Sequence, residues 1–183
     1  MPLRSDLIAL LTAYDPSDPD EVGYRLQMLD LAAVAHDPFS RYEYQPGHFT
    51  ASAFVVHPEG DRMLLVHHER LGIWVQPGGH VEPDDLTVLG AALREIAEET
   101  GISDVVPVSP GLADIDIHAI PETADHPQHL HFDLRFAFVA PDDRVSALDG
   151  VLDAMWVGLD GLDDLGVGRS IIRPLTRILG SAV

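Results

Sequence analysis

The sequence predicts an α+β fold, an α/β/α sandwich in which a mixed β-sheet lies between helices and a helical extension precedes it. Three observations lead to this class. The chain has 183 residues, of which 46% are hydrophobic, and this suits one domain with a substantial core. Short strand-like runs follow one another from residue 49 onward. A central helix and a terminal helix interrupt these runs, as in sheets that are covered by helices.

Two helices are expected at the start of the chain. The first runs from about Ser5 to Tyr14. The second begins at Asp18, where a proline in the first turn and the following acids form a typical start signal, and it ends near His36. We therefore divide the chain into a helical extension of residues 1–47 and a domain of residues 48–183. We expect the two helices to pack on the domain or to form a homodimer contact.

Strands surround one helix in the predicted domain. Leu86–Thr100 has helical apolar spacing, and Gly101 closes the helix as a left-handed cap. A last helix spans roughly Arg169–Leu179. Strands are expected at Phe49–His57, Met63–His68, Ile73–Val75, Val105–Val108, Asp114–Ile120, Leu130–Ala140 and Ala154–Gly158.

The composition excludes several classes of function. Thirty acidic residues against eleven basic ones give a formal charge of −19, which argues against binding to a nucleic acid duplex. The negative charge of the protein still permits a small phosphate-bearing substrate, if cations neutralise the charge locally. The absence of cysteine excludes disulfides, thiolate zinc sites and cysteine nucleophiles. No eighteen apolar residues run together and the opening apolar run is short, so we expect a cytoplasmic protein without a membrane partner.

Three carboxylates share one face of the central predicted helix. At about 100° per residue, Glu95, Glu98 and Glu99 fall on one narrow face, while the apolar residues gather on another. Like charges at this spacing repel one another, and the helix dipole disfavours anions near the C-terminus. A divalent cation reverses that repulsion, and all-oxygen ligands suit Mg²⁺ or Mn²⁺. Arg94, one turn before Glu98, is placed to orient that carboxylate.

The stretch Gly79–Ile102 resembles the signature of the Nudix hydrolase family, G-x(5)-E-x(7)-R-E-U-x-E-E-x-G-U, where U is aliphatic. The match is complete from Arg94 to Ile102, and Gly79 occupies the place of the first glycine. Two departures occur: Asp85 replaces the first glutamate, and eight residues rather than seven separate it from Arg94. Asp85 keeps a carboxylate, so we expect it to brace the loop against the helix. The extra residue is expected at the start of the helix.

This resemblance implies a Nudix-like fold and metal-dependent hydrolysis of a diphosphate linkage in a nucleoside diphosphate linked to another moiety. It implies that Glu95, Glu98, Glu99 and the Gly79 carbonyl hold Mg²⁺ (or Mn²⁺), with Arg94 among the catalytic residues. Metals in such a site polarise phosphate oxygens and activate a water molecule.

Two points stay open: which residue is the general base, and whether the domain catalyses hydrolysis or only binds a nucleotide. The base is Glu95 or a carboxylate on a later loop, for which Glu122 is the best candidate, although a merely exposed Glu122 is the simpler interpretation. A nucleotide-sensing domain without turnover is the alternative function, and the intact set of three glutamates speaks against it. A third function is that of the isomerases with the same fold, which act on isopentenyl diphosphate. Their chemistry resembles one that uses a catalytic cysteine, and we discount it because this chain has no cysteine.

Polar residues alternate along two of the predicted strands. If their polar faces meet, they line a substrate cleft, where Arg135 suits a phosphate. His118 and His131 would then bind a base, a phosphate or an extra metal. A solvent-facing side of an antiparallel sheet is an equally weighted alternative. The residues on these faces are Asp114, Asp116 and His118 in the first strand and His129, His131, Asp133 and Arg135 in the second.

Overall fold

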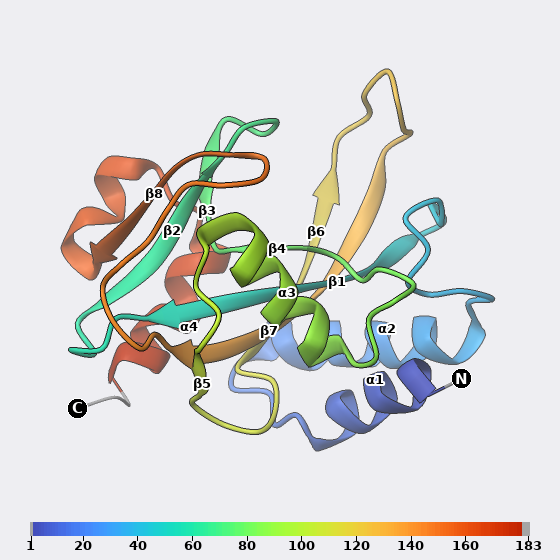
Figure 1. The fold of residues 1–183 in the computed structure, drawn as a ribbon. Coiled ribbons are helices and arrows are strands. Elements are labelled where there is room, and N and C mark those ends of the chain that lie inside the picture. The colour runs from blue at the N-terminus through green and yellow to red at the C-terminus, as the bar shows by residue number, and fades with distance from the viewer. Residues whose placement is uncertain (1, 181–183) are drawn as a thin grey trace.

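A computed structural model of the chain describes residues 2–180 and shows an eight-stranded mixed sheet with helices on both faces (Figure 1). The main strand order is β3-β2-β1-β7-β5, and β4, β6 and β8 pair with β1, β7 and β2. Only β1 and β7 pair in parallel among these strands of residues 2–180. The α+β sandwich predicted from the sequence is confirmed.

The elements have the following bounds. The strands are β1 (Gly47–Val56), β2 (Arg62–His68), β3 (Ile73–Val75), β4 (Gly78–His80), β5 (Val106–Pro107), β6 (Asp114–Ile120), β7 (His129–Val139) and β8 (Val151–Gly158). The helices are α1 (Pro2–Ala13), α2 (Pro19–Val34), α3 (Val88–Thr100) and α4 (Arg169–Gly180), with short 3-10 helices at Leu159–Gly161 and Asp163–Leu165. None of the helices described here is both long enough and apolar enough to cross a membrane.

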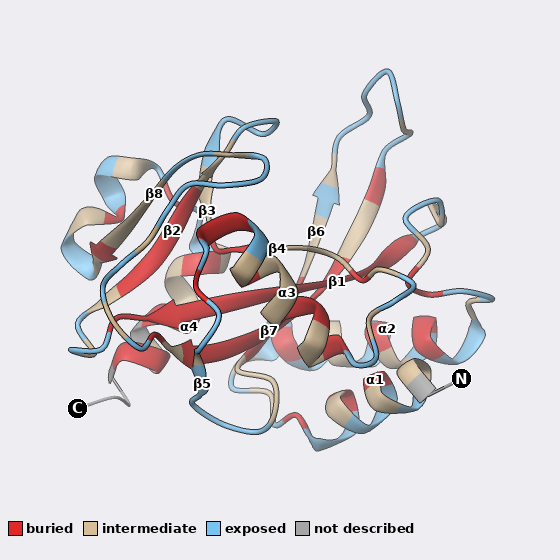
Figure 2. Ribbon diagram, viewed as in Figure 1, coloured by how far each residue is buried: buried red, intermediate tan, exposed pale blue. Residues whose placement is uncertain are grey.

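The central strand β1 separates two environments. It is buried along its whole length, as are most of β2 and β7 (Figure 2). Alternate residues from Phe49 to Val55 pack in one core with α1, α2 and α3. On the opposite face, Phe54 and Val56 pack in a second core with α4, whereas Thr50 and Ser52 line a cavity. One face of the sheet therefore changes from apolar core to polar cavity along a single strand.

The two N-terminal helices pack on the domain, which is one of the two arrangements that the sequence predicted. Leu7 of α1 and Met28 of α2 are fully buried in the same core as Phe49 of β1. Asp6 in α1 also accepts a hydrogen bond from the backbone N–H of Val88, at 2.9 Å, and so satisfies a free donor at the start of α3. The homodimer contact stays a prediction.

The structure corrects several predicted boundaries. Helix α3 begins at Val88 instead of Leu86, because the Thr87 side chain caps it by accepting from the N–H of Gly90. It ends as predicted at Gly101, whose φ of 74° is left-handed. Residues 78–80, which were not among the predicted strands, form strand β4, because their backbone pairs with residues 50–52 of β1. The two 3-10 helices were not predicted.

Candidate active site and cavity

The three predicted carboxylates lie where the end of α3 meets β4. Glu99 is buried, and its Oε2 accepts a hydrogen bond from the N–H of Gly78 at 3.1 Å. The Glu95 carboxylate lies against Gly79, so closely that a Cβ on residue 79 would come within 2.5 Å of Oε1. The Glu98 side chain is 47% exposed. The missing side chain of Gly79 therefore lets the backbone approach the Glu95 carboxylate closely, whereas Gly78 leaves room for Ser52.

Arg94 connects this cluster to the preceding loop. Its Nε and Nη2 donate to the two carboxylate oxygens of Asp85 at 3.2 and 3.0 Å. Its Nη1 donates to Glu95 at 2.8 Å and to Glu98 at 2.9 Å, and Nη2 also reaches the carbonyl of His80 at 2.9 Å. The bidentate contact with Asp85 is the brace that the sequence predicted, and it forms despite the additional residue before Arg94.

The carboxylates are only partly neutralised within the protein. Burial raises the pKa of Glu99 to about 8, and the charges of Glu95 and Glu98 add to this effect. The hydrogen bond from Gly78 acts in the opposite direction. Burial also raises the pKa of Glu95, although Arg94 opposes the shift. An all-oxygen donor set with unbalanced negative charge fits a hard divalent cation such as Mg²⁺.

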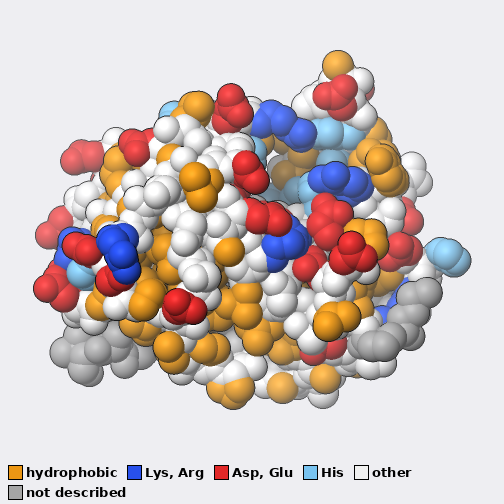
Figure 3. All heavy atoms as spheres, in the orientation of Figure 1, with side chains coloured by type: hydrophobic (Ala, Val, Ile, Leu, Met, Phe, Trp, Pro, Cys, Tyr) orange, Lys and Arg blue, Asp and Glu red, His pale blue; other side chains and the backbone are white. Residues whose placement is uncertain are grey.

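A cavity of about 520 Å³ opens beside β4. Gly78 and Gly79 form part of its wall, so the cavity adjoins the strand that the carboxylates contact. Figure 3 shows the cavity as a hollow with histidine side chains inside it and charged side chains of both signs on its rim. Six of the ten histidines of the chain line it: His68, His80, His118, His126, His129 and His131.

The polar faces of β6 and β7 meet, as the sequence interpretation required. Asp116 lies opposite Asp133, and His118 lies opposite His131 in the antiparallel register. His118 and His131 line the cavity, and Nδ1 of His118 is 3.0 Å from Oδ2 of Asp116. The hydrogen bond with His118 and the charge of Arg135 lower the pKa of Asp116, although burial opposes them. Asp116 therefore stays charged and orients His118 at the cavity wall.

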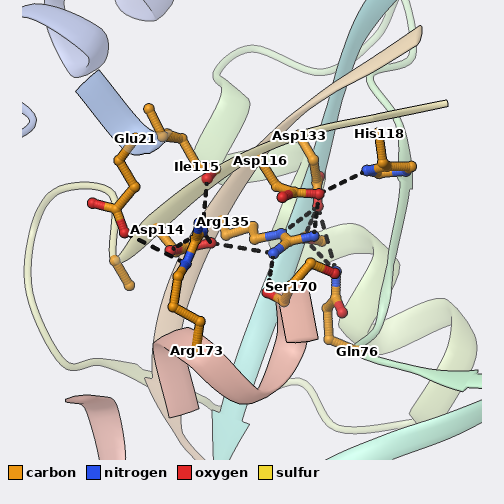
Figure 4. A network of polar contacts seen from close by, with 12 residues as sticks. Glu21, Gln76, Asp114, Ile115, Asp116, His118, Asp133, Arg135, Ser170 and Arg173 are labelled. Carbon is orange, nitrogen blue, oxygen red and sulfur yellow. Dashed lines mark hydrogen bonds and ion pairs between the residues drawn. The ribbon is translucent and has the colours of Figure 1, made fainter. Parts of the chain in front are cut away.

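Arg135 lies at the other end of these faces, beneath α4, and not in the cavity lining (Figure 4). It is only 2% exposed. Its guanidinium donates to Asp133 at 2.8 Å, Asp114 at 3.2 Å and Asp116 at 3.1 Å, and to the carbonyl of Ser170 at 2.7 Å. The predicted role of Arg135 as a phosphate ligand is therefore corrected. Strand alternation identifies the face on which a residue lies but not the helix that covers that part of the face.

Glu122, the loop candidate for the general base, lies between β6 and β7. It is exposed and does not contribute to the cavity lining. The structure thus brings together Gly79, Arg94 and the three helix glutamates, and it leaves Glu122 apart from them.

The sequence interpretation missed His48 and His80, which contact His131 through their rings. The ring centroid of His48 is 4.8 Å from that of His131, and the centroid of His80 is 5.4 Å away. Burial lowers the pKa of His131 to about 2 and that of His80 to about 3, and it also lowers the pKa of His48. These rings are therefore neutral at pH 7. The one sequence signal was the position of His80 directly after Gly79.

Comparisons with known proteins identify the family of this chain. The fold and the α3 carboxylates define a Nudix-type domain, and the NUDIX domain family model matches residues 46–177. The chain therefore belongs to the Nudix family. Phosphatase NudJ of Escherichia coli K12 is 51% identical over 53 residues, which are 28% of this chain. The match spans only 33% of the length of that relative.

Solved structures show the same fold. A Nudix-family hydrolase from Clostridium perfringens has a TM-score of 0.57 and 24% identity, with 74% of this chain and 98% of that chain covered. The MutT protein from Methanosarcina mazei Go1 has a TM-score of 0.58 and 22% identity, with 73% and 93% covered. At these identities, the likeness shows the fold alone.

Proposed function

We propose that this chain is a metal-dependent hydrolase that cleaves the diphosphate linkage of a nucleoside diphosphate linked to another moiety. The observation that carries the proposal is the cluster of Glu95, Glu98 and Glu99 against the Gly78–Gly79 backbone, beside a cavity of small-molecule size. Membership in the Nudix family and the partial match to a phosphatase support it.

Mg²⁺ (or Mn²⁺) would be held by the three glutamates and the carbonyl of Gly79. When bound, such an ion neutralises phosphate charge and lowers the pKa of a water ligand. The protein side chains hold the metal-binding glutamates in position. Arg94 holds Glu95 and Glu98 through charged hydrogen bonds and is itself fixed by Asp85. Arg94 therefore acts by positioning the ligands.

Glu95 is our candidate for the general base. Its carboxylate lies against Gly79, which lines the cavity, and burial raises its pKa towards the range in which a carboxylate accepts a proton efficiently. Glu122 lies exposed outside the cavity, so we assign it no part in the reaction.

The cavity offers groups for a nucleotide-type substrate. Arg41 and Arg70 line it and can neutralise phosphate charge in place of Arg135. Tyr44 and His126 also line it, with ring centroids 6.5 Å apart and planes 29° apart, so an aromatic base can stack beside them. His118 presents a hydrogen-bonding ring to the same space.

A hydrolysis screen tests the proposal, in which added phosphatase and pyrophosphatase convert the released phosphate monoesters or pyrophosphate to free phosphate for detection. Nucleotide sugars, dinucleotides and oxidised nucleoside triphosphates are incubated with the protein and Mg²⁺ or Mn²⁺. We expect hydrolysis of at least one class, lost when metal is chelated. Glu98→Gln should lower the rate by more than about 100-fold, beyond the effect of losing an outer-shell partner, with an unchanged melting temperature.

Two results contradict the proposal. Undiminished turnover in Glu98→Gln removes the mechanism. Nucleotide binding without turnover under any metal supports a sensing domain instead. Glu122→Gln serves as the matched control. A loss of rate in that variant would identify Glu122, and not Glu95, as the general base.

A further inference from the structure

A cluster of three histidines lies on adjacent strands at one end of the cavity. His48 of β1 pairs directly with His131 of β7, and His80 of β4 pairs with Thr50, the next residue on the same face of β1. One ring nitrogen from each of the three histidines lies within 4.8 Å of the others. The order of the strands therefore concentrates three nitrogen donors in one small volume.

His48 has the environment of a metal ligand. It is fully buried, and its Nδ1 lies 3.0 Å from the carbonyl of Glu43, to which it can donate its hydrogen. The other nitrogen, Nε2, is buried and has no hydrogen-bond partner among residues 2–180. A backbone carbonyl behind one nitrogen and an open lone pair on the other is the usual arrangement of a metal-bound histidine. A buried polar atom without a partner also needs an explanation of its own.

We propose that His48, His80 and His131 form a binding site for Zn²⁺ or a similar first-row transition metal, separate from the carboxylate site on α3. Neutral imidazoles favour such ions, whereas Mg²⁺ prefers oxygen donors. Zn–N bonds of about 2.0–2.1 Å in a tetrahedral site place ligand nitrogens about 3.3 Å apart, so the rings need to close by at most about 1.5 Å. His80 and His131 line the cavity, so the remaining coordination position opens towards it.

Arg41 competes with the metal for this site. Its Nη2 lies 2.9 Å from Nδ1 of His80 and can only donate to it. That contact leaves the remaining proton of a neutral His80 ring on Nε2. Coordination at either nitrogen of His80 therefore requires the Arg41 contact to break. The competition leads to a distinctive expectation, because removal of Arg41 should strengthen metal binding.

Metal titration of the purified 183-residue chain tests the proposal without a substrate. Protein freed of metal is titrated with Zn²⁺ by calorimetry and with Co²⁺ by absorption spectroscopy, in excess Mg²⁺ to fill the carboxylate site. We expect one Zn²⁺ per chain and a tetrahedral Co²⁺ spectrum. His131→Gln and His80→Gln should each weaken binding by more than about 10-fold. Arg41→Ala should tighten it.

Matched variants separate this site from the others. Glu98→Gln should keep the Co²⁺ spectrum, so a failure of the proposed hydrolysis leaves this test intact. Glu59→Gln removes an exposed member of a second group, His57, Glu59 and Asp61, and should change nothing. Circular dichroism checks that each variant folds. Equal Zn²⁺ affinity in wild type, His131→Gln and His80→Gln, or the absence of a Co²⁺ spectrum, would overturn the proposal.

Discussion

Replacing Glu99 by glutamine should stabilise the metal-free protein, and the gain should grow with pH. Glu99 is buried, with 7% of its surface exposed, and it accepts a hydrogen bond from Gly78. Glutamine keeps an oxygen for that bond and removes the ionisable group. The substitution therefore isolates the cost of burying a charge near Glu95 and Glu98.

The magnitude follows from the pKa of Glu99, which burial raises from 4.5 to about 8. Because the folded state favours the protonated acid, the penalty is absent below about pH 4.5, grows up to about pH 8 and is then constant. It amounts to about 3 kcal/mol at pH 7. An amide nitrogen without an acceptor costs about 1 kcal/mol. The net gain of about 2 kcal/mol corresponds to a rise of about 4–8 °C in melting temperature.

Urea unfolding followed by circular dichroism, in EDTA between pH 5 and pH 8, measures this difference. The advantage of Glu99→Gln should increase by about 3 kcal/mol across that range. For Glu98→Gln, at a half-exposed position, the free energy of unfolding should differ from that of the wild type by less than about 0.5 kcal/mol. Saturating Mg²⁺ should stabilise the wild type by about 2.7 kcal/mol at 100 times the dissociation constant, and Glu99→Gln by less. A stability difference that is flat with pH would refute the reasoning.

Four further variants test other parts of the structure. Arg135→Met leaves three buried aspartates without their shared cation, so the free energy of unfolding should fall by about 3–5 kcal/mol in urea titrations; a loss below 1 kcal/mol would contradict this. Gly79→Ala displaces only the flexible end of Glu95, so hydrolysis should fall more than about 10-fold with little change in stability. Gly78→Ala clashes with Ser52, so its melting temperature should fall further than that of Gly79→Ala. A truncation that starts at His48 exposes the core around Phe49 and should aggregate; a soluble fragment with the wild-type melting temperature would show that α1 and α2 are dispensable.

Local patterns in the sequence predicted most of the fold. The helix at α3 follows from apolar spacing and a glycine cap, and the cap lies at Gly101 as expected. Strand β4 escaped prediction because a strand of three residues that includes two glycines has no side-chain periodicity. Its existence depends on backbone pairing with β1, which is a tertiary interaction. The division of the chain at residues 47 and 48 stays a prediction.

The site was predictable where its residues are close in sequence. Glu95, Glu98, Glu99 and Arg94 occupy little more than one turn, so helical geometry alone places them together. The histidine cluster joins three strands, and no local pattern indicates that His48 meets His131 across 83 positions of sequence. The burial of Arg135 depends in the same way on α4, which comes from the end of the chain.

The structure contains two clusters of acidic residues, and their charge balance differs. Around Asp114, five carboxylates contact Arg135, Arg173 and Arg177; the carboxylates are Asp18, Glu21, Asp114, Asp116 and Asp133. Burial raises the pKa of Asp114 to about 6, although Arg135 and Arg173 oppose the shift, whereas the pKa values of Asp116 and Glu21 are lowered against the effect of burial.

At the end of α3, Asp85, Glu95 and Glu98 share the charge of Arg94, and burial raises the pKa of the neighbouring Glu99. Both clusters are partly buried and both contain arginine, so acidity alone does not distinguish a structural network from a metal site. The difference lies in the compensation: three arginines contact the acids of the first cluster, whereas Arg94 alone contacts those of the second, which lies beside a cavity. The negative charge that Arg94 leaves unbalanced is what a divalent cation would neutralise, and this is the physical reason to assign the metal to α3 and not to the buried network beneath α4.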